Sequence, residues 1–96
     1  FWMIEPEMAF ADLKDDMECA ESYLKFVIRY VLESCPEDLE FFDNFIEKGL
    51  IERLRHVADS PFAHLTYTNA VDILLKSGKK FDFPVSWGCD LQSEHE

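Results

Sequence analysis

Glycine and arginine are scarce in this sequence, and their scarcity excludes the common ways of holding a phosphate. The 96 residues contain three glycines, too few and too far apart to form a GxGxxG or GxxxxGK[ST] loop. The only arginines are Arg29, Arg53 and Arg55, and all fall in segments that the residue pattern predicts to be helical. We therefore expect this chain to bind no ATP by itself.

Paired cysteines and long apolar runs are also missing. The three cysteines form no CxxC pair, which is typical of reduced thiols in a cytoplasmic protein. The histidines do not supply zinc-ligand spacings, and no serine or cysteine lies in a nucleophile motif, so we expect no metal site and no catalytic residue. No apolar run approaches about 20 residues, so we expect no membrane span. Because the chain opens on Phe1 without an initiator Met, we expect it to be a piece of a longer protein.

Positive charge is in short supply as well. Nine basic residues face twenty acidic ones, which gives a formal net charge of −11. Such a chain repels phosphate backbones, so we expect it to make no direct contact with nucleic acid. Hydrophobic residues nevertheless make up 48% of the sequence, and nine of them are Phe, which indicates one globular domain or part of one.

The first ten residues, FWMIEPEMAF, alternate between two rows of side chains. One row is apolar, and the other contains Glu5 and Glu7, so the pattern predicts a strand with Pro6 at an edge or bulge. On one face of a strand, the two carboxylates would lie roughly 7 Å apart. They could perform acid–base chemistry, bind a metal, or hold an ammonium or amide group. The alternative is a pair of glutamates that face solvent.

Helical periodicity dominates the middle of the chain. We predict helices over residues 12–34, 36–48 and 50–58, and a fourth helix from Thr66 or Thr68 to Ser77. An extended segment over 62–66, a short strand over 80–83 and a helix beginning within 90–96 complete the pattern. Ser93 and Glu96 have the spacing of a capping box. The first helix carries an apolar stripe at steps of three and four, made of Leu13, Met17, Ala20, Leu24, Val27, Ile28 and Val31.

Three stretches resemble one enzyme family. Residues 1–10 resemble the closing strand of the second signature motif of class II aminoacyl-tRNA synthetases, and their FWMIEPE form is similar to the asparaginyl-tRNA synthetases. Residues 67–71, YTNAV, are similar to the family's YTEAV, with Asn69 in place of an acidic residue. Residues 87–96, WGCDLQSEHE, resemble its WGxDL-xSEHE stretch, with Cys89 in a variable position. Because the three stretches follow the family order, the resemblance covers essentially the whole chain.

The resemblance implies an α+β fold. The chain would be part of a class II catalytic domain, in which an N-terminal antiparallel strand is followed by a helical segment. Residues 1–10 would be the second half of the second motif, residues 12–77 the helical segment, and residues 79–96 a loop or strand leading into the next helix. The remaining motifs, including the arginines that hold ATP, would lie outside this chain.

The resemblance also implies a reaction. Asparaginyl-tRNA synthetases use ATP and Mg²⁺ to activate asparagine as an aminoacyl-adenylate, transfer it to tRNA and are typically homodimers. Glu5 matches the family's acidic position in the amino-acid pocket, where a carboxylate accepts a hydrogen bond from the asparagine side chain and repels aspartate. Glu7 would have a weaker, supporting role. We expect no cofactor in the isolated chain.

Two functions stay open at this point. The chain could be a fragment of a working asparagine–tRNA ligase. It could instead be a truncated, non-catalytic paralogue that acts as an interaction or regulatory module.

Overall fold

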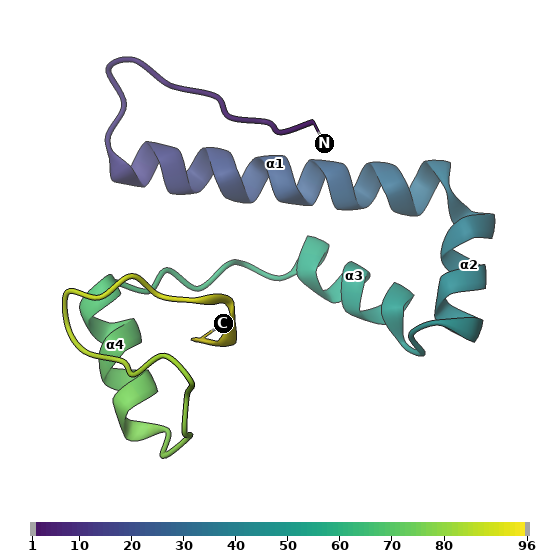
Figure 1. Cartoon of the computed structure of the whole chain (residues 1–96). Coiled ribbons are helices and arrows are strands. Elements are labelled where there is room, and N and C mark those ends of the chain that lie inside the picture. The colour runs from purple at the N-terminus through teal and green to yellow at the C-terminus, as the bar shows by residue number, and fades with distance from the viewer. Residues whose placement is uncertain (1, 96) are drawn as a thin grey trace. The chain divides into compact units, whose positions relative to one another are not determined.

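The chain folds into helices that belong to two compact units (Figure 1). The computed structural model describes residues 2–95. Unit 1 comprises Phe1–Phe62 and unit 2 comprises Ala63–Glu96. Unit 1 contains helices α1 (Leu13–Ser34), α2 (Pro36–Phe45) and α3 (Leu50–Asp59), and unit 2 contains α4 (Tyr67–Lys76) and the short 3-10 helix η1 (Ser93–His95).

Helix α1 begins at a capping box formed by Asp12 and Asp15. The Asp12 carboxylate accepts hydrogen bonds from the backbone N–H groups of Lys14 at 2.8 Å and Asp15 at 3.1 Å. The Asp15 carboxylate in turn accepts the Asp12 N–H at 2.9 Å. These bonds satisfy amide groups that a helix start leaves unpaired, and they confirm Asp12 as the cap.

Helices α2 and α3 meet at a turn around Gly49. Pro36 occupies the first turn of α2, where its missing N–H costs nothing. The helix ends at Phe45, three residues before the predicted end at Lys48, because Gly49 is the N-terminal cap of α3 rather than the residue that closes α2. Gly49 has φ +86°, a conformation that favours glycine. The Asp43 carboxylate ties the turn by accepting the Ile51 N–H at 3.0 Å.

The small core of unit 1 lies where α3 packs against α1 and α2, and Leu39 and Ala58 are its fully buried side chains. Helix α1 also carries a partly buried charged pair, Lys25 and Glu21, whose side chains are only 16% and 23% exposed and 2.6 Å apart. Glu21 also accepts the Phe62 N–H at 3.3 Å, and the Lys25 ammonium lies 5.1 Å from the Phe62 ring centre. The pair is tolerated at this depth because each charge has a partner.

Unit 2 is organised around α4. Thr66 caps this helix by accepting the Asn69 N–H at 3.2 Å, and Val71 is the fully buried residue of the unit. The chain beyond α4 is irregular until η1. The short strand predicted over 80–83 is therefore wrong, and the helix predicted within 90–96 is represented by one turn of 3-10 helix. The proposed capping box of Ser93 involves Glu96, which lies outside the described residues.

The α+β assignment is wrong for the described part of the chain. Residues 2–95 contain helices and no strand, so the N-terminal antiparallel strand predicted over 1–10 is not present. Residues 2–11 are drawn as an extended segment that runs back along α1 (Figure 1). Alternating side chains define two faces, but a strand also needs a neighbouring backbone to share its hydrogen bonds, and no described segment supplies one. Within residues 2–95, no helix combines the length and apolar character needed to cross a membrane.

Candidate functional site

The two glutamates singled out by the sequence lie on the exposed N-terminal segment. Both Glu5 and Glu7 are exposed, and neither has a hydrogen-bond or ion-pair partner among the described residues. Their neighbour Trp2 is 98% exposed. A cleft of about 420 Å³ lies instead along α1 and is lined by Ser22, Lys25, Phe26, Arg29, Tyr30 and Glu33. The structure of this chain therefore does not place Glu5 or Glu7 beside a described cleft.

The other two stretches that resemble the synthetases meet in unit 2. The hydroxyl of Tyr67, the first residue of α4, donates a hydrogen bond to the Cys89 carbonyl at 2.7 Å. The same hydroxyl accepts the Gly88 N–H at 2.8 Å, so one side chain satisfies two backbone groups of the loop. Gly88 has φ +96°, which suits glycine and turns the loop back toward α4.

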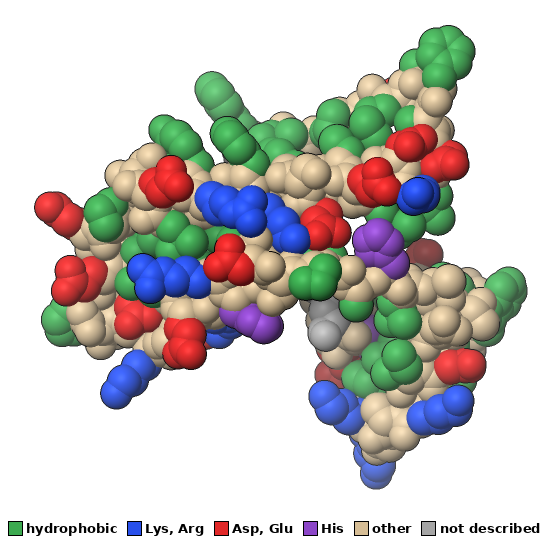
Figure 2. All heavy atoms as spheres, turned by 180° about the vertical axis from the view of Figure 1, so that it is seen from behind, with side chains coloured by type: hydrophobic (Ala, Val, Ile, Leu, Met, Phe, Trp, Pro, Cys, Tyr) green, Lys and Arg blue, Asp and Glu red, His purple; other side chains and the backbone are tan. Residues whose placement is uncertain are grey.

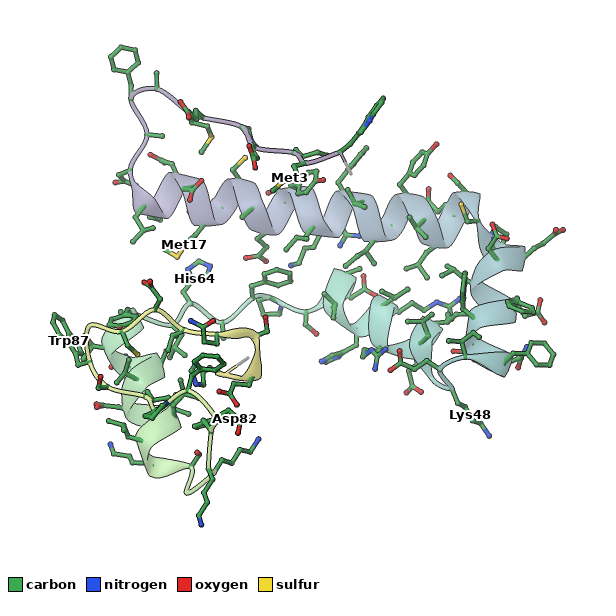
Figure 3. The ribbon with its side chains drawn as sticks, in the orientation of Figure 1. Met3, Met17, Lys48, His64, Asp82 and Trp87 are labelled. Carbon is green, nitrogen blue, oxygen red and sulfur yellow. The ribbon has the colours of Figure 1, made fainter. Side chains whose placement is uncertain are left out.

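Trp87 adds a second connection between the same two stretches. Its indole N–H donates to the Thr68 hydroxyl at 3.1 Å, and its ring lies edge-on to the Tyr67 ring at 6.0 Å between centres. The indole remains 70% exposed, and Figure 3 shows it at the outer edge of the loop. Hydrogen bonds thus join the YTNAV stretch to the WGCDL stretch, although 15 residues separate Val71 from Trp87.

Glu94 fastens the other end of this loop. Its carboxylate accepts the backbone N–H groups of Phe83 at 2.7 Å and Asp82 at 3.1 Å. The hydrogen bond from the Phe83 N–H is the largest effect and holds the pKa of Glu94 below its usual value. Burial opposes it, and the hydrogen bond from Asp82 and the charge of His95 add smaller lowering effects. The carboxylate of Glu94 therefore stabilises the loop in its ionised form.

His95 is the most deeply placed polar side chain of this network, with 1% of its side chain exposed. Its Nδ1 accepts the Gln92 N–H at 2.9 Å, and its Nε2 lies 3.0 Å from the Phe83 carbonyl. The Phe81 ring packs edge-on against the imidazole at 4.8 Å. Because Nδ1 accepts a hydrogen bond from an amide, Nε2 carries the ring hydrogen and donates a hydrogen bond to the Phe83 carbonyl.

Sequence reasoning did not find these roles of Tyr67, Glu94 and His95. Side chains that hold an irregular loop follow no repeating spacing, so periodicity gives no signal for them. Their only mark in the sequence was membership of the two stretches that resemble the synthetases. No group of three or more His, Cys, Asp or Glu side chains in residues 2–95 is arranged to hold a metal ion.

Comparison with known proteins identifies the family. The chain is 69% identical over all 96 residues to an asparagine–tRNA ligase of Clostridium beijerinckii, and it spans 21% of that protein. It is 67% identical to the chloroplastic/mitochondrial asparagine–tRNA ligase of Arabidopsis thaliana, of which it spans 17%, again along its whole length. The chain belongs to the asparagine–tRNA ligase family. The chain is also 64% identical, over the same 96 residues, to the asparagine–tRNA ligase of Clostridium perfringens.

The chain spans about a fifth of the length of these asparagine–tRNA ligases, so it corresponds to a segment of such an enzyme. No family model matches the chain. No solved structure gives a significant match to it.

Proposed function

We propose that this chain is the part of an asparagine–tRNA ligase catalytic domain that carries the selectivity for asparagine. The observation that carries the proposal is the identity of 64–69% to named asparagine–tRNA ligases along the entire chain. The reaction of the full-length enzyme would be the ATP-dependent activation of asparagine and its transfer to tRNA. The truncated-paralogue alternative gains no support, because the relatives that match are named as ligases.

Glu5 is the residue proposed to contact the amino acid. The first thirteen residues contain three acidic side chains, Glu5, Glu7 and Asp12, and no basic one. A ligand beside Glu5 therefore meets a negative local potential, which favours an amide N–H donor and disfavours the carboxylate of aspartate. The exposure of Glu5 leaves its carboxylate free to accept that hydrogen bond. The walls of the amino-acid pocket would come from other parts of the enzyme.

ATP and tRNA would be held mainly by parts of the enzyme outside this chain. Arg29 donates to the Ala58 carbonyl at 2.6 Å and lies 3.8 Å from Asp59, and Arg53 pairs with Glu47 at 2.7 Å. Two of the three arginines are thus engaged within unit 1. The described residues also do not fit Mg²⁺, because no cluster of ligating side chains is present, and no step of the reaction is assigned to a metal here.

The location and assembly of the enzyme follow from the family. We propose a cytoplasmic homodimer, as the unpaired cysteines and the family resemblance suggest. The Arabidopsis relative is named as chloroplastic/mitochondrial, so the compartment differs within the family.

Glu5→Gln in the full-length ligase tests the proposed selectivity. A hydrogen bond to a charged acceptor contributes about 1.5–3 kcal/mol, so the preference for asparagine over aspartate should fall by roughly 10- to 100-fold. The measurement is kcat/KM for amino-acid-dependent pyrophosphate exchange with each amino acid. Glu7→Gln removes the residue with the proposed weaker, supporting role and should lower the preference by less than about threefold. An unchanged preference in Glu5→Gln would exclude this role.

A further inference from the structure

Helix α2 carries an apolar face that no described residue of unit 1 covers. Phe41, Phe42, Phe45 and Ile46 form this outer face of α2 and are 54%, 45%, 74% and 69% exposed. Leu39, on the other side of the helix, is buried in the core. The ring centres of Phe41 and Phe45 are 5.2 Å apart and those of Phe41 and Phe42 are 5.9 Å apart, so the three rings form one continuous surface. The outer face leaves on the order of 400 Å² of apolar side-chain surface in water, which is typical of a contact site.

Unpaired carboxylates border this outer face. Between Pro36 and Glu47 the sequence contains five acidic residues and no basic one. Asp43 and Glu47 are engaged within unit 1, by Ile51 and Arg53 respectively. The other three, Glu37, Asp38 and Glu40, are exposed and have no partner among the described residues.

The end of unit 1 that carries α2 shows the same mixture in the space-filling view. Acidic and hydrophobic side chains are interspersed there (Figure 2). Lys48 projects from the turn that follows α2 and points away from the helices (Figure 3). The outer face of α2 is therefore apolar at its centre and negative along its border.

This combination selects the chemistry of an occupant. A second copy of the chain would bring another acidic border against the first, and a nucleic acid would bring phosphates, so both are repelled. An occupant with apolar side chains flanked by Lys or Arg would cover the rings and pair the three free carboxylates. The related ligases are about five times as long as this chain, so their remaining polypeptide can supply such a segment.

We propose that the outer face of α2 is an intramolecular docking surface, covered by a basic, amphipathic segment from elsewhere in the ligase polypeptide. The proposal rests on the proposed function in one respect, namely that this chain is part of a full-length ligase. It adds the location of the contact and the chemistry of the segment that makes it.

The test compares hydrogen exchange of α2 in three forms of the full-length ligase: the unaltered enzyme, Glu40→Lys and Asp72→Lys. Glu40 and Asp72 are both exposed, both without a partner among residues 2–95 and both near the middle of ten-residue helices, α2 and α4. Lysine at position 40 would repel a basic occupant, so the α2 amides should exchange at least about tenfold faster. Asp72→Lys should leave α2 exchange unchanged.

A second measurement does not depend on a variant folding. In the unaltered enzyme, about 1 M salt shortens the Debye length to about 3 Å and should speed α2 exchange, while α4 exchange stays the same. No change in α2 exchange would overturn the charge-complementary occupant. Fast α2 exchange in the purified enzyme would point to a separate partner protein, and protection that rises with enzyme concentration would point to a second copy. Either result overturns an intramolecular occupant.

Aminoacylation assays on the same preparations separate this inference from the proposed function. Asparagine charging by an enzyme with unprotected α2 would reject the docking surface alone. Protected α2 in an enzyme that charges no asparagine would reject the proposed function alone.

Discussion

Replacing Tyr67 with Phe should loosen the loop of unit 2 while leaving α4 intact. The change removes one oxygen atom and with it two hydrogen bonds, from the Gly88 N–H at 2.8 Å and to the Cys89 carbonyl at 2.7 Å. A neutral hydrogen bond contributes about 0.5–1.5 kcal/mol net. Tyr67 is 38% exposed, so water can replace part of each bond, and we expect a loss of about 1 kcal/mol in total. That corresponds to about fivefold faster opening of the loop.

Amide exchange measured by NMR reports this opening residue by residue. In Tyr67→Phe, the Gly88 amide should exchange about fivefold faster. The Asn69 amide, held by the Thr66 hydroxyl, should keep its rate because the cap of α4 is untouched. Tyr23→Phe is the matched control, since Tyr23 is 42% exposed and its hydroxyl has no partner among the described residues. Equal Gly88 rates in Tyr67→Phe, Tyr23→Phe and the unaltered protein would refute the reasoning.

Two further predictions concern the same unit. Val71→Ala should destabilise unit 2 by about 2 kcal/mol, because Val71 is only 1% exposed. Denaturant unfolding measures this loss. Ile73→Val is the control and should cost less than about 0.5 kcal/mol, because Ile73 is 56% exposed. Acid should release the loop at Glu94, because the pKa of Glu94 is lowered in the folded state. The contribution of its carboxylate to folding stability is complete above the ordinary pKa of about 4.3. It is lost as the pH falls through the lower pKa of the folded state. The protection factors of the Asp82 and Phe83 amides, which correct for the intrinsic pH dependence of exchange, should therefore fall in acid. Glu94→Gln should remove that dependence, and equal acid sensitivity of the protection factors in both proteins would contradict the assignment.

The helices could be predicted because their signals are local. Asp12, Pro36 and Thr66 mark helix starts through the chemistry of the first turn, and each lies where the structure begins a helix. The apolar stripe of α1 was a poorer guide to burial. Met17, Ile28 and Val31 are partly buried, whereas Leu13 and Leu24 are 73% and 47% exposed.

The apolar stripe did not predict burial correctly, because α1 has more apolar surface than α3 covers. The partly buried residues of α1 include Glu21 and Lys25, which no hydrophobic pattern would select. Their burial depends on each other and on Phe62, a residue far away in the sequence. Long-range pairing of this kind cannot be seen in the spacing of residues along one helix.

The strand predicted over residues 1–10 was wrong for a related reason. Alternation around Glu5 specifies which side chains share a face, but the hydrogen bonds of a strand must come from another backbone. The candidate role of Glu5 came from resemblance to a family, and that family is confirmed by the comparisons. The role itself stays a prediction, because the chain alone does not surround Glu5 with a pocket.

The histidine of the SEHE stretch illustrates how a reactive side chain can be withdrawn from reaction. One ring nitrogen accepts a hydrogen bond from the Gln92 N–H and the other donates one to the Phe83 carbonyl, so the imidazole has no free lone pair for a metal ion or a substrate. In this chain His95 therefore acts as a structural clamp on the turn, and any chemistry attempted by its imidazole would first have to open it.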